Sequence, residues 1–190
     1  MSSSFHPAQA DRFVAACGGY RRWELTTKEG VLWWRLASDW GQAHIRGLVV
    51  PANATLRATL DLREPTIGGA TVALVTQLVV GRLGVDGLPF RTRTSVDVSL
   101  SAGTLRIAGE DVVTSVSVSI GEALEHAVVV VAVARREGRV EVELEDAAGG
   151  GARVALAAQV RATPSCLVFF GGGTNGAPES GFGVGVVVVE

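Results

Sequence analysis

His126-Ala-Val-Val-Val-Val-Ala-Val-Ala-Arg-Arg-Glu-Gly-Arg-Val-Glu-Val-Glu-Leu-Glu-Asp146 is the stretch that decides the fold of this chain. Its first part, residues 127–134, is apolar throughout and has the length of a buried strand. Glu137-Gly138 then marks a tight turn. Across residues 139–145, apolar and acidic side chains alternate, which is typical of a strand with one face in water. The stretch therefore predicts an antiparallel hairpin within a packed sheet.

The same two-residue period recurs along most of the chain. Apolar and polar residues alternate over 55–62, 91–100 and 112–120, while 184–189 is apolar without alternation. We expect the alternating runs to be strands with one wet face, and 127–134 and 184–189 to be central strands buried on both faces. Turn signals, many of them glycine pairs, fall about every ten residues and leave no room for long helices. Residues 1–190 are predicted to form a single all-β domain, a two-sheet antiparallel sandwich.

The N-terminal segment, residues 1–19, is the one place where a helix is expected. Pro7 suits a first helical position, and Phe13, Val14 and Cys17 fit one face of a helix. Gly18-Gly19 then ends the pattern. We predict one short helix here that packs on the sandwich.

Composition excludes several classes of function. The net charge is −2, and no basic patch carries interleaved aromatic residues, so we expect no nucleic-acid partner. The sequence shows neither a secretory leader nor an apolar run long enough to span a bilayer, so we expect no membrane partner and a cytoplasmic location. Cys17 and Cys166 form no metal-binding motif, and would form a bridge only if the two terminal segments lie side by side. We expect no metal and no cofactor.

The last 70 residues carry a family resemblance. Gly121-Glu-Ala-Leu-Glu-His126 is a short turn, and the hairpin quoted above follows it. Cys166-Leu-Val-Phe-Phe-Gly-Gly-Gly173 and Gly181-Phe-Gly-Val-Gly-Val-Val-Val-Val-Glu190 then give a glycine-rich strand and a closing strand that rejoins the N-terminal edge. This order, over residues 121–190, resembles the concanavalin A-like and laminin G-like jelly-roll superfamily. The resemblance implies a jelly-roll sandwich, a fold that carries sugar binders, protein binders and glycosidases.

Three carboxylates on one strand face, Glu141, Glu143 and Glu145, form the first candidate site. The pattern is similar to the E-x-D-x-E strand of jelly-roll glucanases, with Glu143 where that family has aspartate. The resemblance would make Glu141 the nucleophile and Glu145 the general acid. The outer two carboxylates are about 13 Å apart along a strand, and no aromatic residue stands beside them. A solvated strand face whose charges discourage edge pairing explains them better.

Tryptophans and two polar rows form the second candidate site. Trp33 and Trp34 must point to opposite faces of a strand, and Trp40 lies in a predicted loop, so an exposed indole there could stack on a sugar or a protein. A polar row is expected to line one sheet face and to hydrogen-bond a ligand. The candidate ligand-binding residues are Trp33, Trp34, Trp40, Arg91, Arg93, Asp97 and Asn175. Asn175 belongs to a glycine-rich run that leads to a strand and lacks the helix of a phosphate loop.

A non-catalytic lectin-like module that recognises a glycan or a protein partner is the function these features favour. A protein-interaction or self-assembly sandwich is the first alternative, and a glycoside hydrolase that uses Glu141 and Glu145 is the second. A Val-rich sandwich has exposed strand edges, so a homodimer through a sheet edge is also expected.

Overall fold

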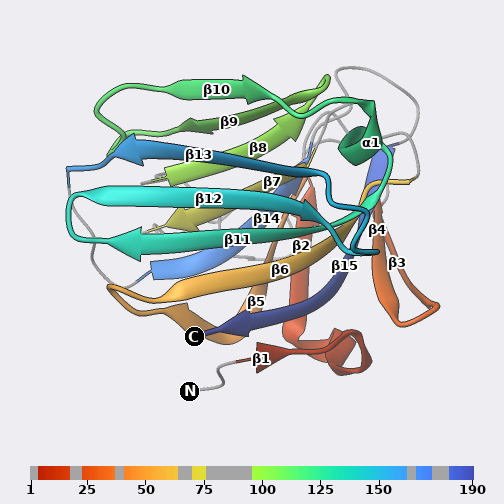
Figure 1. Ribbon diagram of the computed structural model, residues 1–190. Helices are drawn as coiled ribbons and strands as arrows, with labels where there is room; N and C mark the ends of the chain where they lie inside the picture. Colours follow the sequence, from red (N-terminus) through yellow and green to blue (C-terminus); the bar gives the residue numbers. More distant parts are fainter. Residues whose placement is uncertain are drawn as a thin grey trace.

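Two antiparallel sheets packed face to face make up the fold (Figure 1). The computed structural model describes residues 4–17, 23–36, 41–63, 70–75, 96–161, 166–172 and 180–190. Within them, strands dominate and helices are short. The prediction of an all-β antiparallel sandwich is confirmed.

The eight-stranded sheet contains both ends of the described chain. Its strands are β1 (Ser4–Phe5), β3 (Trp23–Lys28), β4 (Val31–Leu36), β6 (Thr55–Asp61), β11 (Val128–Arg136), β12 (Arg139–Asp146), β13 (Arg153–Gln159) and β15 (Ser180–Val189). They lie in the order β13-β12-β11-β6-β15-β4-β3, and β1 pairs with β15. The C-terminal strand thus rejoins the N-terminal edge, as predicted.

The seven-stranded sheet forms the other layer. Its strands are β2 (Phe13–Cys17), β5 (Gly41–Val50), β7 (Ala70–Val75), β8 (Val96–Ser101), β9 (Thr104–Ala108), β10 (Val116–Ser119) and β14 (Cys166–Gly172). Their order is β10-β9-β8-β7-β14-β5-β2. A single helical turn, α1 (Glu122–Glu125), precedes β11 where the sequence indicated only a turn.

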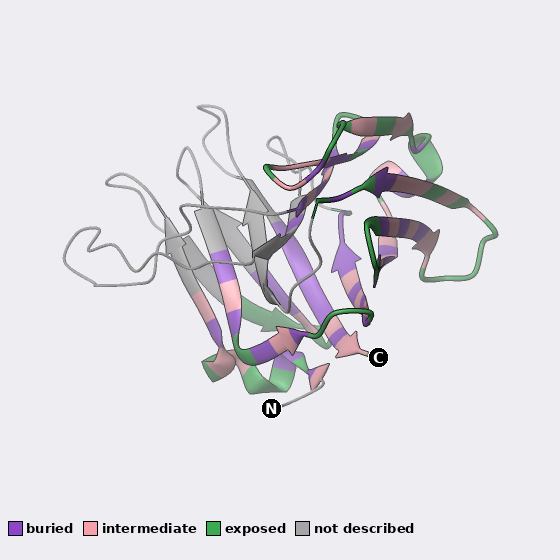
Figure 2. Cartoon of the chain, turned by 90° about the vertical axis from the view of Figure 1, so that its left-hand side faces the viewer, coloured by how far each residue is buried: buried purple, intermediate pink, exposed green. Residues whose placement is uncertain are grey.

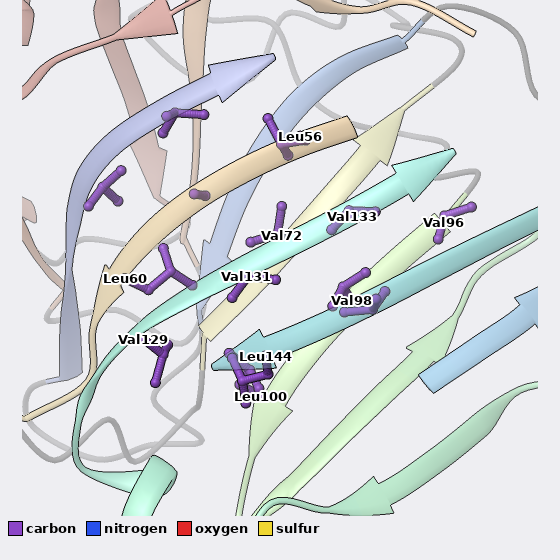
Figure 3. Close-up of a cluster of buried hydrophobic side chains, with 14 of the residues drawn as sticks. Leu56, Leu60, Val72, Val96, Val98, Leu100, Val129, Val131, Val133 and Leu144 are labelled. Atoms are coloured by element: carbon purple, nitrogen blue, oxygen red, sulfur yellow. The ribbon is translucent and has the colours of Figure 1, made fainter. Parts of the chain in front are cut away.

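One apolar core fills the space between the two sheets. Alternate residues of β6, β8 and β12 point inward, and Figure 2 shows the resulting bands of buried and half-buried residues. Figure 3 shows the inward side chains of β6, β11 and β12 packed against those of β7 and β8. Each fully buried Val or Leu side chain stabilises the fold by about 1.5–3 kcal/mol relative to exposure. We call the opposite side of each sheet its outer face.

The two non-alternating runs lie in the sheet interior, as expected, but the outer face of each run is buried only in part. Val129, Val131 and Val133 of β11 are inaccessible, whereas Val128 and Val130 on the outer face are half-buried. The prediction of burial on both faces therefore holds at Ala132, which is 6% exposed, but not along the whole run. Antiparallel hairpins place no helix over the outer face, so apolar side chains there stay in partial contact with water.

The predicted N-terminal helix is shorter than expected. A 3-10 helix begins at Pro7, as predicted, but ends at Arg12, and Gln9 inside it has non-helical dihedral angles. Phe13 starts β2, which pairs with β5, so the prediction of helix through Cys17 was wrong. Pairing with a distant strand has overridden a local pattern that fits a helix.

Arg135 connects the two sheets. Its side chain, only 3% exposed, points to the core side of β11, and its Nη1 donates a 3.0 Å hydrogen bond to the carbonyl oxygen of Val50 at the end of β5. Its backbone N–H donates to the carbonyl of Ala54, just before β6 begins. The arginine thus closes the core at the β5–β6 connection.

The two cysteines lie at opposite ends of β5. Cys17 pairs in register with Gly41, and Cys166 pairs with Val50. The length of β5 separates these positions by about 30 Å at the usual rise per residue. A disulfide needs α-carbons within about 7 Å, so the backbone excludes a bridge between Cys17 and Cys166.

Candidate functional site

The outer face of the seven-stranded sheet carries a polar group centred on β8. Asp97 and Ser99 point outward and are half-buried, because Val96, Val98 and Leu100 alternate with them and point into the core. The described part of the predicted polar row therefore lies on one outer face.

Neighbouring strands extend this polar group. Ser99 lies directly opposite Arg106 of β9, and Arg106 lies opposite Ser117 of β10. Arg106 and Ser117 are exposed. Adjacent strands are about 4.8 Å apart, so a carboxylate, a guanidinium and two hydroxyl groups lie within reach of one small ligand. We call Asp97, Ser99, Arg106 and Ser117 the β8–β10 polar group.

His44 stands on the same outer face, farther along the sheet. It alternates with Ala43 and Ile45, which are buried in the core. Partial burial, and to a smaller extent the positive charge of Arg46, lowers the pKa of His44 below its ordinary value of 6.5. The register puts three strand spacings, about 14 Å, between His44 and Asp97. The imidazole is therefore neutral at pH 7 but does not contact Asp97.

Trp33 lies on the other side of the molecule. In β4 it is directly opposite Gly183 of β15, which in turn is opposite Asp61 of β6. A methyl group at Gly183 would lie 3.4 Å from Cε2 of Trp33, so the indole packs against this glycine on the outer face of the eight-stranded sheet. Trp33 is only 8% exposed. The expectation of an exposed indole is not met at Trp33, and Trp33 cannot share a site with Asp97.

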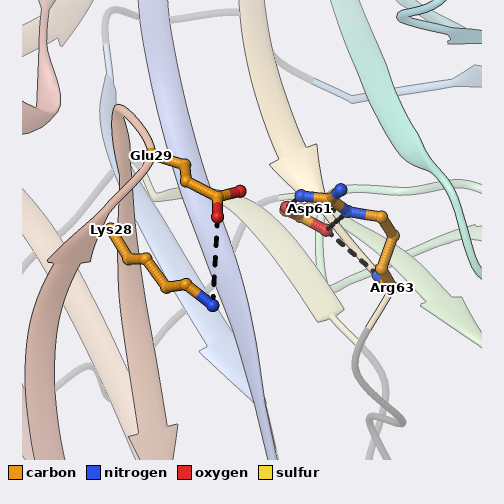
Figure 4. A network of polar contacts seen from close by, with 4 residues as sticks. All are labelled: Lys28, Glu29, Asp61 and Arg63. Atoms are coloured by element: carbon orange, nitrogen blue, oxygen red, sulfur yellow. Dashed lines mark hydrogen bonds and ion pairs between the residues drawn. The ribbon is translucent and has the colours of Figure 1, made fainter.

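Asp61 is a buried carboxylate on this same outer face (Figure 4). The sequence placed it among wet residues of β6, but its exposed fraction is 0%. Arg63 covers it, with Nη2 at 2.6 Å from Oδ2 and Nε at 3.0 Å from Oδ1, and the pair raises the pKa of Arg63. The backbone N–H of Arg63 also donates a hydrogen bond to Oδ1 of Asp61, at 3.1 Å. These bonds occupy both carboxylate oxygens, which indicates a structural role.

The three glutamates of β12 also lie on the outer face of the eight-stranded sheet. Glu141 is 3.0 Å from Arg139 and Glu143 is 2.6 Å from Arg153, in half-exposed ion pairs. β12 is an interior strand between β11 and β13, so these charges do not protect a sheet edge as expected. They form the solvated face of an interior strand.

Several predicted site residues lie outside the described part of the chain. Trp40, Arg91, Arg93 and Asn175 are not described, and for Trp34 only the backbone is. Among the described residues, no three His, Cys, Asp or Glu side chains gather closely enough to hold a metal ion. None of the helices in the described ranges is long and apolar enough to cross a membrane.

Arg106 and His44 were missed in the sequence as members of this face. The signal was present, because Arg106 stands between the apolar residues Leu105 and Ile107, just as His44 stands between Ala43 and Ile45. An outward position follows from that alternation. The pairing of β9 with β8, which brings Arg106 to Ser99, required the structure.

Known structures share this arrangement, although sequence comparison finds nothing: no family model and no curated protein matches the chain. The lumenal domain of VIP36, in a form bound to Ca²⁺ and Man3GlcNAc, aligns with 99% of this chain and 87% of its own at a TM-score of 0.68 and 10% identity. A legume lectin-like domain from Entamoeba histolytica aligns over 95% and 90% (TM-score 0.63, 9% identity).

Lectin I-B4 from Griffonia simplicifolia, in its metal-free form, aligns with 100% of this chain and 99% of its own, at a TM-score of 0.58 and 13% identity. At identities this low, the alignments establish the fold alone, and the ligand has to be argued from the residues of this chain. All three alignments cover nearly the whole chain, well beyond the closing strands. The chain has the concanavalin A-like, legume lectin-like jelly-roll fold.

Proposed function

We propose that this chain is a non-catalytic lectin-like module that binds a glycan on the outer face of the seven-stranded sheet. The observation that carries the proposal is the β8–β10 polar group, which combines a hydrogen-bond acceptor, a charged donor and two hydroxyls on three adjacent strands.

Sugar hydroxyl groups need this mixture of partners. A carboxylate such as Asp97 accepts hydrogen bonds from neighbouring hydroxyls, and a guanidinium such as Arg106 donates to their oxygens. Hydrogen bonds to charged groups contribute about 1.5–3 kcal/mol each, more than those between neutral groups. Ser99 and Ser117 both donate and accept, and so adapt to either role.

The structural relatives support a glycan as the ligand class. VIP36 is described in a form bound to Man3GlcNAc, and the Griffonia protein is named a lectin. The fold is theirs, while the choice of outer face rests on the residues of this chain.

The hydrolase alternative fits the geometry less well. Glu141 and Glu145 are four residues apart on one strand, about 13 Å, whereas paired catalytic carboxylates are separated by about 5–9.5 Å. Glu141 is engaged by Arg139, and on the neighbouring strand Ala134 lies directly opposite it. The described residues beside Glu141 thus include a small apolar neighbour and a cation, and the neighbouring strands β11 and β13 offer no second carboxylate at the catalytic spacing.

The experiment is a glycan-array screen of the purified protein, with and without calcium, followed by calorimetric titration of any hit. Asp97→Asn and Arg106→Ala should each weaken binding by about 10–100-fold, because each removes a charge-assisted hydrogen bond. Glu143→Gln, on the opposite sheet, is the matched control and should leave the affinity unchanged. A blank array, or equal losses in all three variants, would contradict the proposal and favour a protein partner.

A further inference from the structure

Arg106 is exposed on the outer face of the seven-stranded sheet, and within the described part of the chain no residue bonds its guanidinium. Most other described arginines are engaged by a carboxylate or by a backbone carbonyl oxygen. These engaged arginines are Arg12, Arg57, Arg63, Arg135, Arg136, Arg139, Arg153 and Arg161. The guanidinium of Arg106 is therefore available to a ligand.

Two hydroxyl groups flank Arg106 in one row across the sheet. The register pairs Arg106 with Ser117 of β10 on one side and with Ser99 of β8 on the other. Residues that are directly opposite each other on neighbouring strands have Cβ atoms about 4.5–5.5 Å apart. Both hydroxyls therefore lie beside the same guanidinium, and none of the three residues in this part of the row is acidic.

A carboxylate is the ligand group that uses all of these donors. A guanidinium donates two parallel hydrogen bonds to the two oxygens of one carboxylate. Those oxygens accept about four hydrogen bonds in all, so each oxygen can also accept one from a serine hydroxyl. A sugar hydroxyl has a single oxygen and leaves part of the guanidinium fork unused. The row at Arg106 is therefore better matched to an acid than to an alcohol.

Asp97 lies in the next row of the same face and suits the other end of an acidic sugar. It is two residues before Ser99 on β8 and pairs with Ala108, so it is diagonal to Arg106. Diagonal neighbours on adjacent strands are about 7–8 Å apart. The ring of a uronic acid spans a comparable distance between its carboxylate and its far hydroxyls. Asp97 can therefore accept hydrogen bonds from those hydroxyls while Arg106 holds the acid.

We propose that the β8–β10 polar group binds an acidic glycan, in which the carboxylate of a uronic acid residue is held by Arg106, Ser99 and Ser117. This inference rests on the proposed function and names the class of its ligand. A neutral sugar of the same skeleton keeps the hydrogen bonds to Asp97 but loses the ion pair with Arg106. The acid should therefore bind about 10–100-fold more tightly than its neutral counterpart.

Calorimetric titration of the full chain with matched pairs of sugars tests the proposal. The acidic probes are trisaccharides of galacturonate, glucuronate and mannuronate. Each neutral partner is the same trisaccharide after its carboxyl groups have been reduced to alcohols. The wild type should bind at least one acid about 10–100-fold more tightly than its neutral partner. An increase in salt of about tenfold should weaken the binding of the acid and leave that of the neutral partner nearly unchanged.

Four variants locate the carboxylate on the sheet. Arg106→Gln should remove the preference, so that the acid and its neutral partner bind with similar affinity. Arg106→Lys keeps the charge without the fork and should retain part of the preference. Asp97→Asn should weaken both members of a pair and leave the preference in place, because it acts on the ring hydroxyls. Arg57→Gln, the same change on the eight-stranded sheet, is the matched control and should alter neither affinity.

Circular dichroism confirms that every variant is folded before its affinity is interpreted. Equal affinity of the wild type for an acid and its neutral partner overturns this inference and leaves the proposed glycan binding in place. A preference that survives Arg106→Gln also overturns it, because the carboxylate is then bound elsewhere. Absence of binding to every probe overturns it as well, and the proposed function falls with it only if the glycan array is also blank.

Discussion

Arg135→Ala should be among the most destabilising substitutions in this protein. The side chain is 3% exposed and bonds the carbonyl of Val50 across the sandwich at 3.0 Å. Truncation removes a charge-assisted hydrogen bond, about 1.5–3 kcal/mol, and two buried methylene groups at about 0.8 kcal/mol each. The free energy of unfolding should therefore fall by about 3–4.5 kcal/mol, which corresponds to a melting temperature lower by about 10 °C.

The neighbouring Arg136 provides a control of the same residue type. It is exposed, and it hydrogen-bonds the carbonyl oxygens of Asn53 and Arg135. Arg136→Ala should therefore change stability by less than about 0.5 kcal/mol. Urea unfolding followed by circular dichroism measures both variants. A loss of less than about 1 kcal/mol in Arg135→Ala would refute a link between the two sheets at this position.

Two further predictions concern packing and pH. Gly183→Ala should destabilise the fold by about 1–3 kcal/mol, because the new methyl group would clash with Cγ1 of Val31 and lie 2.9 Å from Cβ of Asp61. Gly185→Ala, whose closest contact is Cβ of Thr59 at 3.0 Å, should cost less in the same urea series. The burial of His44 lowers its pKa below 6.5, so the unfolded chain binds that proton more readily and wild-type stability should fall as the pH drops below 6.5. His44→Gln should flatten this part of the stability profile, with the exposed His6→Gln as control, and a slope unchanged by His44→Gln would contradict the assignment.

Local sequence patterns predicted most of the strands because their information is short-range. The β11–β12 hairpin follows from an apolar run, a Glu-Gly turn and an alternating run that are contiguous in the sequence. The prediction of a helix beyond Phe13 failed for the opposite reason. Its conformation is set by pairing with β5, about 30 residues away along the chain, and a five-residue pattern cannot encode that pairing.

Predicting the site from the sequence was harder, since side chains from distant segments decide it. Trp33 is covered because it packs against Gly183, about 150 residues away. The burial of Asp61 depends on the guanidinium of Arg63 folding back over it. The sequence supplied the correct outward direction for Asp97, but not the assignment of Trp33 and Asp97 to different sheets.

Nuclear magnetic resonance titration of the isotope-labelled protein with a panel of mono- and oligosaccharides is the most direct test of glycan binding by the seven-stranded sheet. The backbone amide signals report which surface each sugar contacts. Glycan binding by the β8–β10 polar group predicts saturable shifts that cluster on β8, β9 and β10 around Asp97, Ser99 and Arg106. No shifts with any sugar, or shifts confined to the eight-stranded sheet, would contradict it.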